Sequence, residues 1–358
     1  MSLNTKIIGI GSHLPANIMK NEDFKGYTFY KKTGVRIDKP TEQIVKKLED
    51  ISEIKERRYA TKGTDNASMA AAAAEAAIQD SGIDRETIDQ IIFAHNFGNV
   101  PKTGFNNDLL PNLSARVKHK LGIKNEMCVA YDILFGCPGW VQGIIQGHLY
   151  IKAGAAKRIL VIGADLMSRM VDNNDLDSML FSDGAGACVI EAEESEEASG
   201  VLAFKTVSSC KTDLNYITSA QSILSKDEDD PIYYIRMNGR GVYKYGLEKV
   251  PAAINATLEA AGLKIEDVSK FLIHQANGKM IKQMIQKAFK AKGFKGYDEK
   301  VLPLNVQFIG NNSVATIPVL WDWIRKGKLE GHEINKGDIV VIASVGAGMH
   351  ANCIVYKA

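Results

Sequence analysis

The chain has 358 residues, of which 45% are hydrophobic and 24% are charged, as in globular proteins with a large core. Its formal net charge of +2 gives no electrostatic argument for binding nucleic acid, and no apolar stretch approaches the roughly 18 residues that a membrane span needs. Five widely spaced cysteines, without a CxxC pair or a Cys/His cluster, argue against a zinc site and favour a reduced, cytoplasmic protein.

The order of the predicted elements repeats along the chain. Residues 77–94 and 257–274 both predict a helix stopped by glycine, a short polar link and a buried strand, in a register without gaps. Residues 183–190 and 345–355 form a second pair of similar segments, or echo, and each predicts a glycine-rich bend followed by an apolar strand. Two echoes in the same order indicate two copies of one α/β unit.

The remaining predicted elements fit a sheet covered by helices. They are apolar strands at 158–163 and 339–343 and helices at 67–79 and 280–292. Continuous apolar strands are typical of α/β sheets that are buried on both faces. The acidic stretch 191–197 predicts a surface connector. We therefore expect an N-terminal half, residues 1–197, and a C-terminal half, residues 198–358.

Cys137 stands at a predicted corner between a strand and a helix. An apolar strand, residues 127–131, precedes it, and Pro138 suits the first position of the helix that follows. The helix dipole at that end favours a thiolate, which is the nucleophilic form of cysteine. The alternative is a small buried core thiol, since free cysteine is among the most buried residue types.

Two further polar residues follow elements of the second copy. His274 ends a buried strand, residues 271–273, and active sites of α/β folds gather at the carboxyl ends of such strands. A satisfied structural histidine is the alternative. Asn311 lies in a Gly-Asn-Asn-Ser turn before a predicted helix, which turn and N-cap chemistry alone can explain. Periodicity does not place these residues beside Cys137.

Seven motifs occur in one order along the chain, at residues 8–15, 54–58, 131–140, 181–187, 274–277, 310–313 and 346–348. With them the chain resembles the thiolase superfamily and, within it, β-ketoacyl-acyl-carrier-protein synthase III and its relatives, over nearly its whole length. The resemblance implies a duplicated βαβ sandwich, with layers of helices and two mixed sheets, and a homodimer. It agrees with the internal echoes.

The resemblance also implies roles for individual residues. Cys137 would accept an acyl group from a thioester, and His274 and Asn311 would stabilise the enolate of a malonyl thioester during decarboxylative Claisen condensation to a 3-oxoacyl product. Backbone N–H groups of Cys137 and of the bend Gly346-Ala347-Gly348 would form the oxyanion hole. The chemistry needs no metal or cofactor, because coenzyme A or phosphopantetheine thioesters are the substrates. Fatty acid biosynthesis is the expected pathway.

The binding residues of the family are less well matched. The family's adenine-stacking Trp is missing from residues 41–47, and its Arg is missing from residues 172–177. Extra length occurs at residues 22–50 and 96–112, so we expect an acyl substrate other than acetyl, longer or already bound to a carrier.

The resemblance suggests Lys244, near Gly239, as a contact to phosphopantetheine. Lys279 begins a basic helix face that fits an acidic acyl carrier protein. An ordinary solvated face is the alternative reading of these lysines.

Other functions stay open at this point. The chain could be a specialised relative that joins two acyl chains or acylates a non-malonyl acceptor in secondary metabolism. It could also be an inactive partner subunit of a heterodimeric synthase, although such subunits usually lose the nucleophile. Hydroxymethylglutaryl-CoA synthase would need a further carboxylate that the sequence does not reveal. A dehydrogenase is disfavoured because Gly184-Ala185-Gly186 precedes a strand rather than a helix.

Overall fold

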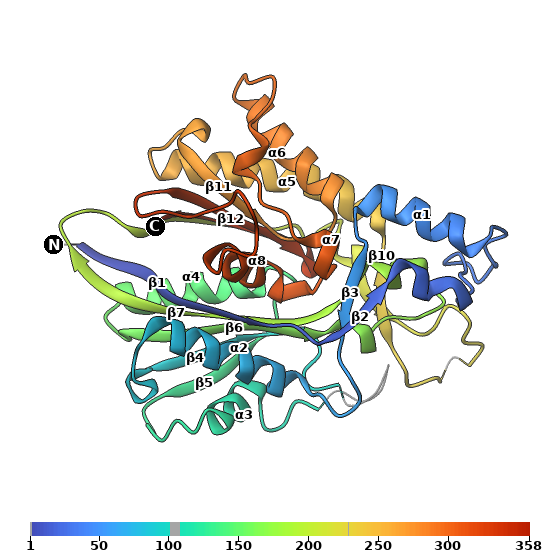
Figure 1. The fold of residues 1–358 in the computed structure, drawn as a ribbon, viewed down its shortest axis with the longest axis horizontal. Helices are drawn as coiled ribbons and strands as arrows, with labels where there is room; N and C mark the ends of the chain where they lie inside the picture. The colour runs from blue at the N-terminus through green and yellow to red at the C-terminus, as the bar shows by residue number, and fades with distance from the viewer. Residues whose placement is uncertain (1, 101–107, 228) are drawn as a thin grey trace.

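The computed structural model describes residues 2–100, 108–227 and 229–358. Its strands are stacked between layers of helices, and both chain ends lie at the same end of the molecule (Figure 1). The main sheet has nine strands in the order β11-β12-β13-β8-β1-β7-β6-β4-β5. Part of the 96–112 segment that we expected near the substrate entrance, residues 101–107, lies outside the described residues.

The two halves of this sheet have the same topology. The first half contains β1 (Ser2–His13), β4 (Gln90–Ala94), β5 (Val129–Ile133), β6 (Arg158–Leu166) and β7 (Asp183–Ser195). The second contains β8 (Gly200–Ser208), β11 (Val268–Ile273), β12 (Ile339–Gly346) and β13 (His350–Lys357). In each half two antiparallel pairings are followed by a parallel one, β1–β7–β6–β4 and β8–β13–β12–β11. The halves join at a single pair, Thr5 and Gly200, so the two expected sheets are continuous.

Helices cover both faces and fill the space between the halves (Figure 1). The helices of the first half are α2 (Asn66–Ser81), α3 (Leu113–Lys120) and α4 (Gly139–Lys152). Those of the second half are α5 (Gly239–Ala260), α6 (Gly278–Ala291), α7 (Val306–Ile309) and α8 (Thr316–Arg325). The α/β architecture that the sequence predicts, a sheet covered by helices, is confirmed.

The Ala-rich helix α2 shows why the sequence folds in this way. Asp65 caps it by accepting a hydrogen bond from the Ser68 N–H at 2.6 Å, and Gly82 ends it in the left-handed conformation at φ +68°. Gly11 of β1 approaches α2 so closely that a Cβ there would lie 2.4 Å from the backbone nitrogen of Ala77. Small side chains on both elements therefore allow the helix to lie directly on the sheet.

Two local predictions differ from the structure. Most of the acidic stretch expected to be a connector belongs to β7, whose outer end pairs with the start of β1 and carries an ion pair between Lys6 and Glu193 at 3.3 Å. The first glycine-rich segment, residues 183–190, is strand throughout rather than a bend. Glycine and glutamate are poor strand formers, but the ladder with β1 outweighs that preference.

The extra length at residues 22–50 packs beside the strands β2 (Asn17–Lys20) and β3 (Glu56–Tyr59). It forms a short 3₁₀ helix and α1 (Thr41–Ser52). Arg57 of β3 is fully buried beneath it, donates a hydrogen bond to the Met179 carbonyl, and lies 5.2 Å from the centre of the Phe24 ring. Burial lowers the pKa of Arg57 to about 10. The Arg57 guanidinium thus contacts both the extra length at residues 22–50 and the 172–180 loop.

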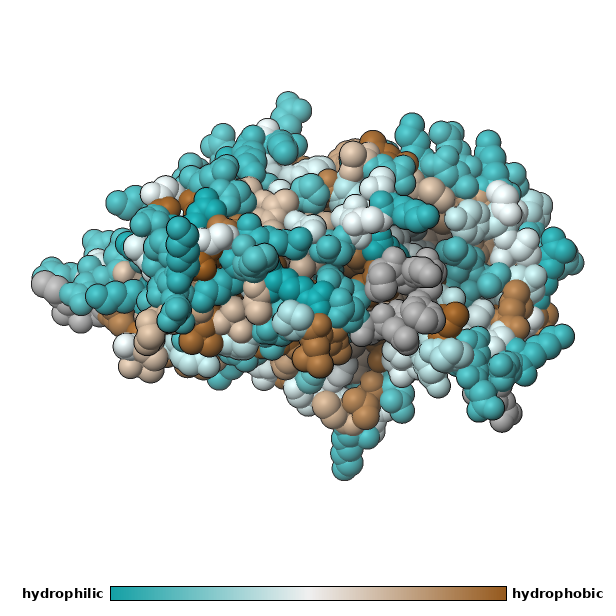
Figure 2. All heavy atoms as spheres, turned by 90° about the horizontal axis from the view of Figure 1, so that it is seen from below, coloured by the Kyte–Doolittle hydropathy of each residue, from teal (hydrophilic) through white to brown (hydrophobic). Residues whose placement is uncertain are grey.

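The strand β5 forms one edge of the main sheet. In the described part of the chain it pairs with β4 alone. Hydrophobic side chains are exposed along and beside this edge, among them Met127 at 81%, Val129 at 57% and Leu134 at 64%. Viewed from below Figure 1, the side of α3 and β5, hydrophobic side chains reach the surface in several places among hydrophilic ones (Figure 2). This edge is therefore less polar than a solvated surface usually is.

Candidate active site

Cys137, His274 and Asn311 line one cavity of about 260 Å³. Cys137 lies between β5 and the start of α4, His274 directly follows β11, and Asn311 follows α7. The nucleophile therefore comes from the first half of the sheet, and the two other side chains come from the second half. The structure therefore brings the three residues together, and their catalytic roles stay a prediction.

The corner at Cys137 depends on two glycines. Gly136 has φ +64°, and a Cβ there would lie 2.7 Å from the Ala347 nitrogen. A Cβ on Gly346 would lie 2.5 Å from the Cys137 nitrogen. The bend after β12 thus packs against the backbone amide of Cys137, and the oxyanion hole expected there stays a prediction. Ala347 lines the cavity, whereas Gly348, at φ +75°, faces the ring of His350.

The Cys137 thiol is neutral at physiological pH. Burial raises its pKa to about 11, although a hydrogen bond from the Ser313 hydroxyl, with Oγ 3.5 Å from Sγ, acts in the opposite direction. The sequence led us to expect a thiolate at the helix end, whereas burial in the cavity favours the neutral thiol. Desolvation of the thiolate outweighs the attraction of the α4 N-terminus, which begins at Gly139 with Pro138 as its N-cap. A base must therefore take the proton when substrate binds.

His274 is buried and neutral. Its exposed fraction is 3%, and burial lowers its pKa to about 3. Nδ1 lies 2.7 Å from the Thr316 hydroxyl oxygen, and the backbone N–H of His274 donates to the Ala343 carbonyl. When Thr316 donates to Nδ1, the ring proton stays on Nε2, where it can serve as a hydrogen-bond donor.

Asn311 is fixed by its own turn. Its Oδ1 accepts a hydrogen bond from the Ser313 N–H at 3.0 Å. Its backbone N–H donates to the Leu180 carbonyl, and its carbonyl accepts from the Ser182 N–H, both at 2.9 Å. Because Oδ1 is occupied, the Nδ2 group is the part of the amide available to a ligand in the cavity.

A buried polar network that the sequence analysis missed lies behind Cys137. Asn96 Nδ2 donates to Ser313 Oγ at 2.9 Å and to Asp165 Oδ2 at 2.6 Å, and its backbone N–H donates to Asp165 Oδ1 at 2.8 Å. Asp165 is fully buried, and Ser313 has φ +53°. Asn96 and Asp165 stand at the carboxyl ends of β4 and β6. This position was the available sequence signal, since polar residues there commonly form sites.

The rest of the cavity wall is largely apolar. It includes Phe97, Met167 and Phe181 and residues of the hairpin β9 (Ile217–Ala220) and β10 (Tyr234–Met237). Such a wall suits an acyl chain or the arm of a thioester carrier, because apolar lining with few polar groups is typical of sites for small molecules.

The three predicted binding residues do not line this cavity. Lys244 is exposed on α5 and borders a shallow surface hollow with Lys287 and Lys290. Gly239 is the first residue of α5, with open space around it, and Lys279 is exposed on α6. Their contact to phosphopantetheine or to a carrier therefore stays a prediction.

The loop where the family has its coenzyme-binding Arg is acidic. Asp172 and Asp175 are buried there and hold Arg236 of β10, whose Nη1 lies 2.8 Å from Asp175 Oδ2. Lys32 from the N-terminal insertion reaches Asp177 at 3.0 Å. The basic groups at this position are thus engaged with carboxylates of the chain itself.

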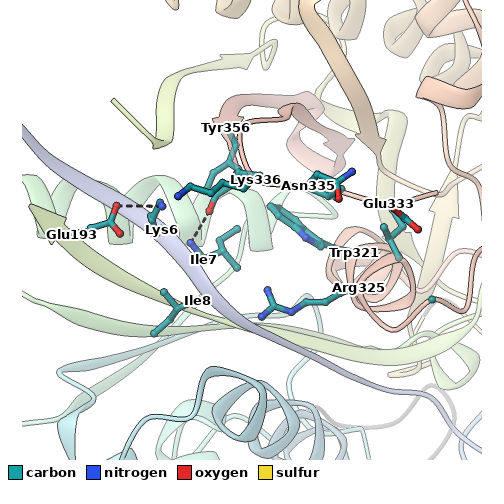
Figure 3. Close-up of a pocket in the computed structure, with 14 residues that line it drawn as sticks. Lys6, Ile7, Ile8, Glu193, Trp321, Arg325, Glu333, Asn335, Lys336 and Tyr356 are labelled. Carbon is teal, nitrogen blue, oxygen red and sulfur yellow. Dashed lines mark hydrogen bonds and ion pairs between the residues drawn. The ribbon is translucent and has the colours of Figure 1, made fainter. Parts of the chain in front are cut away.

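A second, larger cavity of about 670 Å³ lies beside β1, α8 and the end of β13 (Figure 3). Two of its cations are already paired, Lys6 with Glu193 and Arg325 with Asp80 at 3.0 Å. The Tyr356 hydroxyl accepts a hydrogen bond from the Ile7 N–H at 2.9 Å. None of the residues lining it is a predicted catalytic residue, so the smaller cavity is the candidate active site.

The chain is similar to known proteins in sequence and in fold. Residues 131–209 match the model of the 3-oxoacyl-[acyl-carrier-protein] synthase III family, and residues 258–358 match its C-terminal model. The β-ketoacyl-[acyl-carrier-protein] synthase III of Brucella melitensis is 33% identical over 359 residues, covering 99% of each chain.

Solved structures are similar over the same length. The 3-oxoacyl-[acyl-carrier-protein] synthase III of Aquifex aeolicus has a TM-score of 0.80 at 29% identity, covering 99% of this chain and 100% of that one. The synthase III of Thermus thermophilus has a TM-score of 0.77 at 29% identity, covering 98% of each chain.

The fold and the matched sequences define a thiolase-like acyltransferase. The chain belongs to the β-ketoacyl-acyl-carrier-protein synthase III family of condensing enzymes. Among the described residues, no helix is long and apolar enough to cross a membrane, and no group of three or more His, Cys, Asp or Glu side chains is placed to hold a metal ion.

Proposed function

We propose that this enzyme transfers an acyl group from a thioester to Cys137 and then condenses it with a malonyl thioester, giving a 3-oxoacyl product. The observation that carries the proposal is the meeting of Cys137, His274 and Asn311 in one largely apolar cavity. One half of the chain, residues 1–197, supplies the nucleophile, and the other, residues 198–358, supplies the other two side chains.

In the first half-reaction the sulfur of Cys137 attacks the thioester carbonyl. The carbonyl oxygen becomes negatively charged, and backbone N–H groups of Cys137 and of the bend Gly346-Ala347-Gly348 are the expected donors to it. The covalent acyl-enzyme divides one difficult condensation into two easier steps.

In the second half-reaction the malonyl thioester loses carbon dioxide and becomes a carbon nucleophile. The enolate oxygen needs hydrogen-bond donors that keep their own protons. Neutral His274 and the Nδ2 group of Asn311 fit that role. Simple transfer to a hydroxyl or amine would not need such a pair. This supports carbon–carbon bond formation over acyl transfer alone.

We propose a carrier-bound acyl group rather than acetyl-CoA as the primer. The carboxylates of Asp172 and Asp175 occupy the loop where an adenine-stacking Arg is expected, and Arg236 is engaged with both. Coenzyme A carries phosphates that this arrangement would repel, whereas a phosphopantetheine arm on a carrier protein lacks the adenosine phosphates.

A carrier protein would dock on the exposed lysines of α6. Lys279→Glu should raise KM for a carrier-linked acyl donor and leave KM for a small thioester unchanged. Lys282 is a poorer choice, because it pairs with Glu53 at 2.9 Å and its reversal would also disturb α1. Equal effects on both donors would contradict docking at this face.

We also propose a homodimer formed through the β5 edge, in fatty acid biosynthesis in the cytoplasm. The exposed apolar side chains at Met127, Val129 and Leu134 support this interface, since an unpaired apolar edge favours pairing with a second copy. Light scattering of Val129→Lys should show a monomer where the wild type shows a dimer.

The proposed function is tested by the intact mass of the protein after incubation with acyl-CoA and acyl-carrier thioesters. A mass gain that disappears in Cys137→Ala establishes the acyl-enzyme, and the donor that reacts fastest identifies the primer. Malonyl thioester is then added, and the product is analysed. A 3-oxoacyl product supports the proposal. Joining of two acyl chains supports the specialised relative, and no mass gain with any donor supports an inactive subunit.

A further inference from the structure

The proton of Cys137 needs an acceptor that the family motifs do not supply. Burial raises the pKa of the Cys137 thiol to about 11, and it keeps His274 neutral with Nδ1 at the Thr316 hydroxyl. Ser313 Oγ, however, lies 3.5 Å from Cys137 Sγ, and the Ser313 side chain is buried. A hydroxyl can accept one proton while it gives another away.

The hydroxyl of Ser313 lies between the thiol and a carboxylate. Asn96 Nδ2 donates to both Ser313 Oγ and Asp165 Oδ2 and so holds the hydroxyl beside Asp165. Burial raises the pKa of Asp165, while hydrogen bonds from Asn96 and Ser313 oppose that rise. A fully buried carboxylate without a cationic ion-pair partner is costly, and it becomes less so when it gains a proton. The ionisable ring that acts electrostatically on Asp165 is His95, whose Nε2 lies 3.0 Å from Asp132 Oδ2, and His274 lines the cavity itself.

We propose that Ser313 and Asp165, aligned by Asn96, form a relay that accepts the thiol proton of Cys137 during acylation. This inference rests on the acyl transfer proposed above. Ser313 touches the reacting sulfur, whereas Asp165 is a positioning residue that acts through Ser313. The relay deepens the proposed function by naming the base for its first step.

Protons are conserved both when the acyl group bonds to Cys137 and when the carrier thiol leaves. As the Cys137 sulfur bonds to the thioester carbon, its proton moves to Ser313 Oγ, and the hydroxyl proton of Ser313 moves to Asp165. When the bond between that carbon and the carrier sulfur breaks, Ser313 gives a proton to the leaving thiolate and regains one from Asp165. Both side chains return to their starting forms, and no oxidant or reductant takes part.

The backbone of Ser313 supports a functional reading of this residue. A non-glycine residue at φ +53° is uncommon, and such conformations are often retained at functional sites. In this conformation the Ser313 N–H holds Asn311 while its hydroxyl faces Cys137. Glycine would adopt the same backbone without strain and would lack the hydroxyl.

The test is the pH dependence of Cys137 alkylation by iodoacetamide, followed by the mass of the Cys137 peptide. With the relay, the rate of the wild type is constant through the neutral range, because the proton moves within the network and the total charge does not change. In Asp165→Asn and Ser313→Gly the rate should rise about tenfold per pH unit there, as free thiolate forms. At neutral pH it should fall by about 10²-fold, the size of a general-base contribution.

An electrostatic role alone predicts the opposite sign for Asp165. Its negative charge raises the pKa of Cys137, so Asp165→Asn would then react faster than the wild type at neutral pH. A wild-type rate without a plateau, or variants that are as fast as the wild type, would overturn the relay. If Asp165→Asn does not fold, the alkylation rate of Ser313→Gly alone tests the relay.

Asp183→Asn is the matched control. Asp183 is another fully buried carboxylate, but its partners are the Ala60 N–H and the N–H and hydroxyl of Ser168. This variant should keep the plateau, and its loss there would count against the relay. Alkylation needs no acyl donor, so the relay can stand even where every donor in the mass experiment fails. A plateau without an acyl-enzyme would refute the proposed function alone.

Discussion

Replacing Thr316 by valine removes the hydrogen-bond partner of His274 Nδ1 and leaves the size of the side chain nearly unchanged. The side chains have similar shape, and Thr316 is 1% exposed, so no cavity is created. The lost bond joins Nδ1 and the hydroxyl oxygen across 2.7 Å inside the protein. A buried group left without its partner costs about 1–3 kcal/mol of folding free energy. We therefore expect a thermal midpoint lower by a few degrees.

The effect on the reaction should be confined to its second half. Without Thr316 the ring proton of His274 is no longer held on Nε2, so the enolate loses a fixed donor. A net contribution of about 1.5 kcal/mol corresponds to about tenfold in rate, and loss of a whole oxyanion donor corresponds to about 10²–10³-fold. Decarboxylative condensation by Thr316→Val should fall within these bounds, whereas acylation of Cys137 should keep its rate.

The assay separates the two steps. Acylation is followed by intact mass, and condensation is followed by release of product from preformed acyl-enzyme with malonyl thioester. Thr316→Ser keeps the hydroxyl and should restore condensation, although it loses a methyl group. The reasoning is refuted if Thr316→Val condenses at the wild-type rate, or if acylation falls as much as condensation does.

Two other changes give equally direct tests. Gly136→Ala places a Cβ 2.7 Å from the Ala347 nitrogen, so acylation of Cys137 should be lost. The control Gly122→Ala, at φ +68° in open space, should lower the folding stability by only the roughly 1–2 kcal/mol that a left-handed residue costs. Equal acylation by both variants would contradict this. Burial lowers the pKa of His148 to about 4, below its unfolded value of about 6.5, so its contribution to stability is present above that value and is lost as pH falls toward 4. His148→Gln should therefore lose less thermal stability than the wild type on acidification, and an identical loss would speak against this assignment.

Local sequence patterns were sufficient for the repeated architecture. Gly82 and Gly262 end corresponding helices at φ +68° and +69°, and each is followed by a short 3₁₀ turn and a strand, as the first echo predicts. These features depend on neighbours in sequence, such as a glycine that can become left-handed and an apolar run that follows it. The corner at Cys137 was predictable for the same reason.

Features that depend on distant residues were not predictable in this way. The pKa of Cys137 is set by burial among side chains from both halves, so its helix-end position alone gave the wrong direction. The link from Asn96 to Ser313 crosses 217 positions of the chain, and no periodic pattern encodes it. The strand character of residues 191–195 likewise comes from pairing with the start of β1.

The single pairing between Thr5 and Gly200 has a consequence for how such an enzyme can diversify. A Cβ on Gly200 would lie 2.0 Å from the Thr5 carbonyl oxygen, so the two ladders meet there backbone to backbone. After an ancestral duplication, one copy could specialise in carrying a nucleophile and the other in stabilising an enolate. Each copy could vary its loops independently, provided that this contact kept the two sets of strand ends facing one another.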